Sequence, residues 1–332
     1  MTPGARREGA VVRAAGVAAA VLATTMVTDV LAQTWPARPI RLVHGFLAGG
    51  NVDLNARLIA SPMAERLGQQ VIVEGRPGAG GTVVAGQVAR AEPDGYTLFL
   101  AAAGHSAAPA LYRALPYDAA RDFTYITQVS SNPYLVIIHP SFPGRTMKEL
   151  VAIARREAGR LDYATGGVGT GMHLVSLLMQ SQLGIRMNHV AYKGGQATPT
   201  AVAGGEVPVM VGTPGEVQPL VDAGRLRVIA VTSSKRWSAW PDVPTLAETV
   251  LPGFHVTGWS VLAGPAKMPA DVVAKLHEAA RAAMARADVV EKFRAKGSDA
   301  APTDPAFTQA FVAGEVARWT KTVKEAGIPP QN

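Results

Sequence analysis

Tyr163-Ala-Thr-Gly-Gly-Val-Gly-Thr-Gly-Met-His-Leu-Val-Ser-Leu-Leu-Met179 is the stretch on which the predicted fold depends. It is typical of a short strand, a glycine-rich turn and a helix whose first turn is left bare. Backbone amides at a helix start lack intrahelical partners and lie at the positive end of the helix dipole, so glycines that let a ligand approach them create an anion site. No Lys follows the glycines as in a P-loop, and no G-x-G-x-x-G opens the turn, so a carboxylate or phosphate is favoured over a nucleotide.

The same succession of strand, turn and helix extends in both directions from this stretch. The apolar periodicity predicts strands at residues 40–46, 71–74, 96–102, 123–129, 134–138, 161–164, 188–192, 207–211 and 226–232, and helices at 54–67, 82–91, 146–157, 271–286 and 305–326. Strands this apolar have no solvent-facing side, which indicates an α/β fold of parallel sheets covered by helices. Glycine-rich turns follow the carboxyl ends of several strands, where open α/β sheets bind ligands, so we expect two domains with a ligand cleft between them.

The composition narrows the function classes. The chain has 332 residues, of which 48% are hydrophobic, enough to form the cores of two domains. It contains no cysteine, which excludes thiol catalysis and thiolate metal sites; we expect no metal and no cofactor. The formal net charge is +7, but Lys and Arg are scattered singly, so a solvated surface is favoured over nucleic-acid binding. A mild positive field still favours anionic ligands in a cleft.

The first residues have the pattern of an export signal. Arg6, Arg7 and Arg13 precede an apolar run, and Val30-Leu31-Ala32 ends in small residues suited to signal peptidase. An uncleaved anchor is disfavoured because the apolar run is shorter than a bilayer span. We therefore expect residues 1–32 to be a cleaved signal peptide and the rest of the chain to reach the periplasm.

Two short motifs carry more than one interpretation. Gly104-His105-Ser106-Ala107-Ala108 follows a predicted strand and approximates the G-x-S-x-G turn of serine hydrolases, with Ala108 in place of the last glycine. Ser106 is thus the nucleophile of an exported hydrolase or, as we favour, a residue that caps a helix or contacts a ligand. His105, at a strand end, is a candidate ligand contact. Near the expected site, Asp53 is predicted to cap a helix, and His173 to be a buried histidine that holds the preceding loop.

Together with further segments, these residues resemble the Bug-type solute receptors, the extracytoplasmic substrate-binding components of tripartite tricarboxylate transporters. The resemblance spans the mature chain and rests on segments such as Trp35-Pro-Ala-Arg-Pro-Ile-Arg-Leu-Val, Glu74-Gly-Arg-Pro-Gly-Ala-Gly-Gly81, Pro93-Asp-Gly-Tyr-Thr-Leu98, Leu115-Pro-Tyr-Asp118, Ala223-Gly-Arg-Leu226 and Pro241-Asp-Val-Pro-Thr245. It implies a type II periplasmic-binding fold, in which two α/β domains joined by crossing strands close over a small carboxylated ligand. Domain 1 would comprise residues 33–135 and 258–332, and domain 2 residues 136–257.

The resemblance also implies a non-catalytic receptor with a defined set of contacts. A ligand carboxylate would lie on the turn matching Gly169, Thr170 and Gly171, and the first-domain turn would supply amides from the other side. The full set of expected ligand-binding residues is Phe46, Leu47, Gly49, Gly50, Asn51, His105, Ser106, Thr165, Gly169, Thr170, Gly171, Tyr192, Lys193 and Thr213. The implied partners are the transporter's membrane subunits, and we expect a monomer that does not bind nucleic acid.

The chain departs from the family pattern in two turns. The family usually has a Pro-Phe-Pro-Pro-Gly-Gly-Gly/Ser-Thr-Asp-like first turn, whereas this chain has Gly45-Phe-Leu-Ala-Gly-Gly-Asn-Val-Asp53. After Met210 the family commonly has Asp-Asn, and this chain has Gly212-Thr213. Both turns would face the cleft, so we expect either a ligand unlike the usual dicarboxylates or an orphan receptor without a dedicated transporter.

Overall fold

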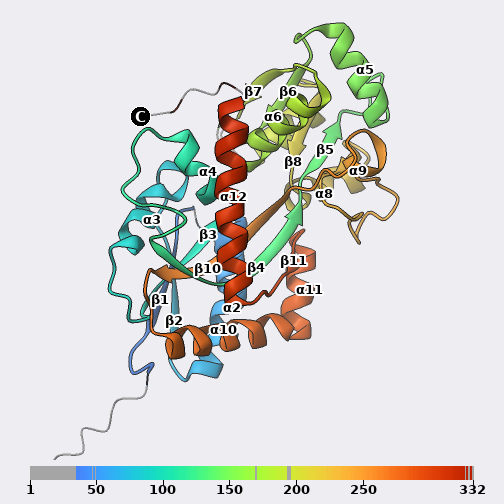
Figure 1. Cartoon of the computed structure of the whole chain (residues 1–332). Coiled ribbons are helices and arrows are strands. Elements are labelled where there is room, and N and C mark those ends of the chain that lie inside the picture. The colour runs from blue at the N-terminus through green and yellow to red at the C-terminus, as the bar shows by residue number, and fades with distance from the viewer. Residues whose placement is uncertain are drawn as a thin grey trace, which may run out of the picture. The chain divides into compact units, whose positions relative to one another are not determined.

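The computed structural model describes residues 35–46, 48, 50–168, 170–192, 196–325, 327 and 330. Contacts set residues 38–332 apart as one compact unit. The predicted signal peptide lies outside the described residues. Both sheets of the protein belong to this compact unit, and Figure 1 follows the chain through them.

The first sheet has six strands in the order β11-β4-β10-β3-β1-β2. Its strands are β1 (Ile40–His44), β2 (Val71–Gly75), β3 (Thr97–Ala102), β4 (Phe123–Pro133), β10 (Thr257–Pro265) and β11 (Asp299–Ala300). The helices associated with it are α2 (Asn51–Leu67), α3 (Thr82–Ala89), α4 (Gly104–Leu111), α10 (Ala270–Ala285), α11 (Ala287–Ala295) and α12 (Pro305–Glu325), with a short 3-10 turn η1 (Ala79–Gly81) before α3.

The second sheet has five strands in the order β7-β6-β8-β5-β9. Its strands are β5 (Leu135–Ile138), β6 (Asp162–Thr165), β7 (Asn188–Ala191), β8 (Val209–Gly212) and β9 (Arg227–Val231). Its helices are α5 (Met147–Glu157), α6 (Gly171–Leu183), α7 (Ala197–Ala203), α8 (Pro214–Asp222) and α9 (Leu246–Thr249). The α5 helix begins with a capping box between Thr146 and Glu149, which fixes its first turn.

The sheets are mixed, which corrects the expectation of parallel sheets. β10 runs antiparallel to β3 and β4, and β5 runs antiparallel to β8 and β9. The physical reason is that the chain passes from one sheet to the other: β4 leads through Tyr134 into β5, and the chain returns from β9 to β10. A strand that enters from the other sheet runs opposite to the βαβ units around it. Two α/β sheets joined by crossing strands are thus present, while the domain boundaries stay a prediction.

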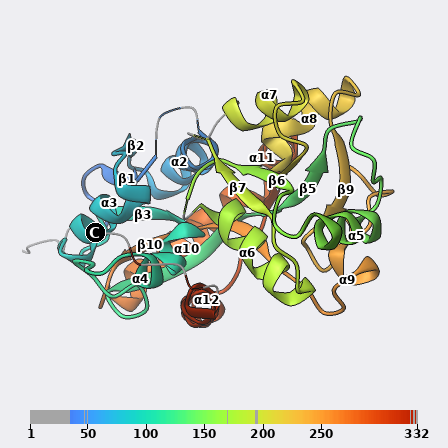
Figure 2. The ribbon, with the colours of Figure 1, turned by 90° about the horizontal axis from the view of Figure 1, so that it is seen from above.

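The helix α12 packs against both groups of elements. It contacts α4 and β4 on one side and α6 on the other, and Figure 2 looks along its axis. Its residue Val312 joins the core of the first sheet, whereas Trp319 joins the core of the second. The buried Glu315 carboxylate accepts hydrogen bonds from Trp259 Nε1 (3.2 Å) and Trp319 Nε1 (3.3 Å) and pairs with Arg318.

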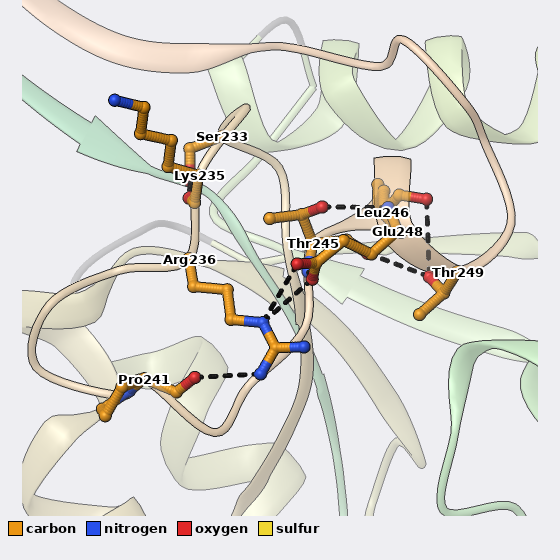
Figure 3. A network of polar contacts seen from close by, with 8 residues as sticks. All are labelled: Ser233, Lys235, Arg236, Pro241, Thr245, Leu246, Glu248 and Thr249. Atoms are coloured by element: carbon orange, nitrogen blue, oxygen red, sulfur yellow. Dashed lines mark hydrogen bonds and ion pairs between the residues drawn. The ribbon is translucent and has the colours of Figure 1, made fainter.

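The segment between β9 and α9 is fixed by a polar network (Figure 3). Arg236 donates from Nε to both carboxylate oxygens of Glu248 at 3.1 and 3.0 Å, and from Nη1 to the Pro241 carbonyl oxygen at 3.1 Å. The neighbouring Trp237 is 5% exposed and packs in the core of the second sheet, with Trp240 edge-on against it. Trp237 is therefore part of the core beneath this segment.

Candidate functional site

The ends of three strands lie at one edge of the second sheet. β6 and β8 are parallel neighbours that end at Thr165 and Gly212. β5 is antiparallel to β8 and begins with Leu135 opposite Gly212, which places Tyr134 at the same edge. Helices α6 and α8 start a few residues beyond β6 and β8. The carboxyl edge of the parallel strands thus gathers two helix N-termini and one tyrosine.

The start of α6 is capped, so the expectation of a bare first turn is wrong. Thr170 is the N-cap residue, and its hydroxyl accepts a hydrogen bond from the His173 amide at 3.4 Å while it donates to the Gly167 carbonyl at 2.8 Å. A cap satisfies only one of the amides of the first turn, and the dipole still favours an anion there. Gly169, the predicted contact just before the cap, lies outside the described residues.

Tyr134 lies against this helix start. A Cβ atom added to Gly171 would collide with the Tyr134 hydroxyl oxygen, so the glycine is what allows the ring to come this close. Tyr134 is 5% exposed, and burial together with the nearby Glu216 carboxylate raises the pKa of its phenol. Tyr134 was not expected at the site, because an aromatic side chain between two strand segments is typical of core packing.

Thr165 and His173 both contact the ring of His189, near the start of α6. The Thr165 hydroxyl lies 2.7 Å from His189 Nε2. His189 stacks on His173 with ring centroids 4.1 Å apart and on Tyr163 at 5.0 Å. Burial and the adjacent His189 lower the pKa of His173 to about 4, so its ring is neutral at pH 7. His173 is thus a buried packing residue next to the site.

Thr213 and Tyr192 occupy the neighbouring turns. Thr213 is the N-cap of α8, where it forms a capping box with Glu216, whose pKa burial raises. Tyr192 follows β7, and its hydroxyl donates to Glu206 at 3.3 Å. Lys193, the next expected contact, lies outside the described residues. Of the expected second-domain contacts that the structure describes, all lie at this edge, since the Tyr192 amide donates to the Thr165 carbonyl at 2.9 Å: Thr165, Thr170, Gly171, Tyr192 and Thr213.

The turn between β1 and α2 holds the expected first-domain contacts. Gly50 is the N-cap of α2, in extended backbone and without a side-chain cap, and Asn51 is exposed at the first helical position. Phe46 is half-buried, and Leu47 and Gly49 lie outside the described residues. The start of α2 is therefore a second helix N-terminus at the carboxyl end of a strand.

Asp53 anchors this turn. Its carboxylate, in the first turn of α2, lies 3.0 Å from His44 Nε2 and accepts from Arg57 Nε at 2.9 Å. The N-cap of α2 is Gly50, so Asp53 acts from within the first turn through the side chains of His44 and Arg57. The departure from the family pattern at Gly45 also has a packing consequence: a Cβ atom there would collide with the backbone of Gly81, at the start of α3.

His105 and Ser106 are directed into the first domain, and the structure does not support a ligand contact from either side chain. His105 is 5% exposed, with its Nε2 2.9 Å from the Tyr125 hydroxyl, and burial lowers its pKa to about 3. The Ser106 hydroxyl is fully buried and donates to the Ala103 carbonyl at 2.7 Å. A nucleophile would need this hydroxyl on a base, so the geometry favours the helix-start interpretation.

Other features of the described residues give no competing site. Two surface hollows lie elsewhere, one of about 260 Å³ between Leu58 and Lys292 and one of about 230 Å³ beside Trp240. Within the part of the chain that the structure describes, no group of three or more His, Cys, Asp or Glu side chains could hold a metal ion. No described helix is long and apolar enough to cross a bilayer.

A family profile and several solved structures match most of this chain. The profile of the family described as "Tripartite tricarboxylate transporter family receptor" matches residues 55–328. The structure of Rpa4515 from R. palustris with adipate is 32% identical, with a TM-score of 0.79 over 90% of this chain and 100% of that one. The periplasmic binding protein BugD is 34% identical, with a TM-score of 0.77 over 90% and 100%. MatC from Rhodopseudomonas palustris with bound malate is 32% identical, with a TM-score of 0.75 over 87% and 100%.

These likenesses agree with the fold described above. The expectation of an α/β periplasmic-binding fold is confirmed, because proteins of that kind superpose on this chain along nearly all of their own length. The profile match begins within α2 and ends just beyond α12, so it includes the turn between β6 and α6, whereas the turn between β1 and α2 precedes it. The chain therefore belongs to the family of tripartite tricarboxylate transporter receptors, the Bug-type solute receptors.

Proposed function

We propose that this protein is a periplasmic receptor that binds a small carboxylated metabolite between its two domains and delivers it to the membrane subunits of a tripartite transporter. The observation that carries the proposal is the edge of the second sheet, where the start of α6, the Tyr134 hydroxyl and the Thr165 region converge. The relatives solved with adipate and malate support a dicarboxylate as the ligand class. We further propose export by the signal peptide at residues 1–32 and action as a monomer.

The energetics of such a site need no buried cation. Hydrogen bonds to a charged group contribute about 1.5 to 3 kcal/mol each. Micromolar binding corresponds to about 8 kcal/mol. Two or three donors at the start of α6, with a similar set at the start of α2, are sufficient for a dicarboxylate after the loss of ligand freedom. The second helix start, beginning at Asn51, would hold the other end of the ligand.

Domain closure is supported by a contact between α8, a helix of the second sheet, and the segment after α11, a helix of the first sheet. Gly215, in the first turn of α8, packs on the backbone of the segment after α11, and a Cβ atom at Gly215 would lie 2.6 Å from the Lys296 carbonyl oxygen. Gly297 belongs to the same contact, and a Cβ atom there would collide with the Gly215 amide nitrogen. A ligand that touches both domains only when these segments meet would shift the protein toward this arrangement.

We propose no catalytic role for Ser106. Its hydroxyl donates to a backbone carbonyl, and the adjacent imidazole of His105 faces the phenol of Tyr125. A fluorophosphonate probe that labelled the protein at Ser106 would contradict this part of the proposal.

Thermal denaturation of residues 33–332 with mono-, di- and tricarboxylates tests the function. We expect stabilisation by at least one dicarboxylate, since a ligand at 100 times its Kd stabilises a protein by about 2.7 kcal/mol. The variant Gly171→Ala should lose the response because its methyl group would collide with the Tyr134 hydroxyl at the helix start. Gly314→Ala is the matched control, since a Cβ atom there meets nothing within 4 Å. The absence of stabilisation by every acid would overturn the proposal.

A further inference from the structure

We propose that the Tyr134 hydroxyl donates a hydrogen bond to the ligand carboxylate at the start of α6, and so acts as a specificity-determining residue of the receptor. The inference rests on the proposed function and adds to it a contact on the strand that connects the two sheets. The first observation is position. Tyr134 lies between β4 and β5, at the edge where β6 and β8 end.

The second observation is that this hydroxyl lies against the helix start and forms no hydrogen bond within the described part of the chain. Tyr134 is 5% exposed, and its oxygen occupies the space in which a Cβ atom of Gly171 would lie. Within the described part of the chain, the hydrogen bonds of Tyr134 are made by its backbone alone. The phenols of Tyr117 and Tyr163 also lack a hydrogen-bond partner among the described residues, so it is the position of the Tyr134 hydroxyl at a helix N-terminus that indicates an acceptor from outside.

The third observation is that the ring is held in place. The Tyr134 amide donates to the Thr232 hydroxyl at 2.9 Å, and the Tyr134 carbonyl accepts from the Thr232 amide at 3.0 Å. The Thr232 hydroxyl in turn donates to the Val256 carbonyl at 2.6 Å, just before the chain returns through β10. The two connections between the sheets thus fix the backbone from which the phenol projects, and its ring packs in the core of the second sheet.

The chemistry of this position suits a carboxylate acceptor. The phenol keeps its proton at neutral pH, because burial and the nearby Glu216 carboxylate both raise its pKa. It is therefore a donor at the pH at which a carboxylic acid ligand is charged. The positive end of the α6 dipole adds to the attraction, and the Thr170 side chain caps only the His173 amide of the first turn.

Isothermal titration with adipate and with malate, on the protein and on Tyr134→Phe, tests the inference. We expect Kd to rise by about tenfold to a hundredfold for an acid that the protein binds, the range expected for one hydrogen bond to a charged group. The matched control is Tyr117→Phe, which removes another buried hydroxyl, in the core of the first sheet, and should leave Kd unchanged. An unchanged Kd in Tyr134→Phe, with or without a change in Tm, would overturn the inference.

A second measurement covers the case in which Tyr134→Phe fails to fold. The protein is labelled with ¹³C at the tyrosine Cζ atoms. The Tyr134 resonance is assigned by substituting the other tyrosines one at a time, and it should shift when adipate or malate binds. A resonance unaffected by a bound acid would contradict the contact. If the unaltered protein bound neither of these acids nor any other carboxylate, both the proposed function and this inference would fail. If it bound an acid with the same Kd in Tyr134→Phe, only this inference would fail.

Discussion

Exchange of His105 for phenylalanine should make the protein less sensitive to acid. His105 lies among Phe99, Tyr117, Phe123 and Tyr125, with ring centroids 4.9 to 6.3 Å away. The Tyr125 hydroxyl donates to the Ala119 carbonyl at 2.6 Å, so it accepts from His105 Nε2, which fixes the neutral tautomer. Burial lowers the pKa of this imidazole from 6.5 to about 3.

The lowered pKa sets the sign and the size of the effect. The unfolded chain binds a proton at His105 below pH 6.5 and the folded protein does so only below about pH 3, so stability is complete above pH 6.5 and declines as the pH falls toward 3. The loss is about 1.4 kcal/mol per pH unit, or about 2 kcal/mol between pH 7 and pH 5. His105→Phe removes this contribution, at a cost near 1 kcal/mol at pH 7 for the lost hydrogen bond.

Urea unfolding followed by tryptophan fluorescence at pH 7 and pH 5 measures the difference. The free energy of unfolding should fall by about 2 kcal/mol less in His105→Phe than in the unaltered protein. The exchange His139→Phe, at a half-buried histidine beside Ser141, controls for removal of an imidazole as such. Equal losses in His105→Phe and the unaltered protein would refute the burial argument, and loss of ligand binding at pH 7 would restore His105 as a ligand contact.

Three further predictions concern closure, the serine motif and the C-terminal helix. Gly215→Ala should raise the ligand Kd without unfolding the protein, since its methyl group would lie 2.6 Å from the Lys296 carbonyl in the contact between α8 and the segment after α11; small-angle scattering that showed normal ligand-induced compaction would count against this. Ser106→Ala should cost about 1 kcal/mol of stability and leave ligand affinity intact in calorimetry, whereas a loss of affinity would return this serine to the site. Glu315→Ala should destabilise by about 3 kcal/mol or more in urea unfolding, because Arg318 and two indole N–H groups lose their buried acceptor; a change below 1 kcal/mol would contradict this.

The sequence was sufficient to predict the strands and helices whose apolar residues recur with a strong period. Strand β6, the turn and the helix α6 follow from glycines at the strand end and from an apolar helical face. The helices α7 and α8 were missed, because Pro199 and Pro219 interrupt the helical pattern. A signal for α8 was present, since Pro214 at the first helical position follows Thr213 and precedes Glu216 in a capping box.

The strand directions and some site residues could not be predicted from the sequence. A crossing strand such as β5 is as apolar as its parallel neighbours, so periodicity does not reveal that it runs antiparallel. The motif around Ser106 likewise does not tell which way its hydroxyl points, and the structure directs it inward. Tyr134 joins the candidate site only through a contact with Gly171, a residue far along the chain.

A crystal structure of the protein with bound adipate or malate tests the central claim most directly. We predict a ligand carboxylate within hydrogen-bonding distance of the backbone at Thr170 and Gly171 and of the Tyr134 hydroxyl, with the other end of the ligand facing the start of α2. A ligand bound instead in the hollow between Leu58 and Lys292, or elsewhere away from the α6 start, would contradict the account.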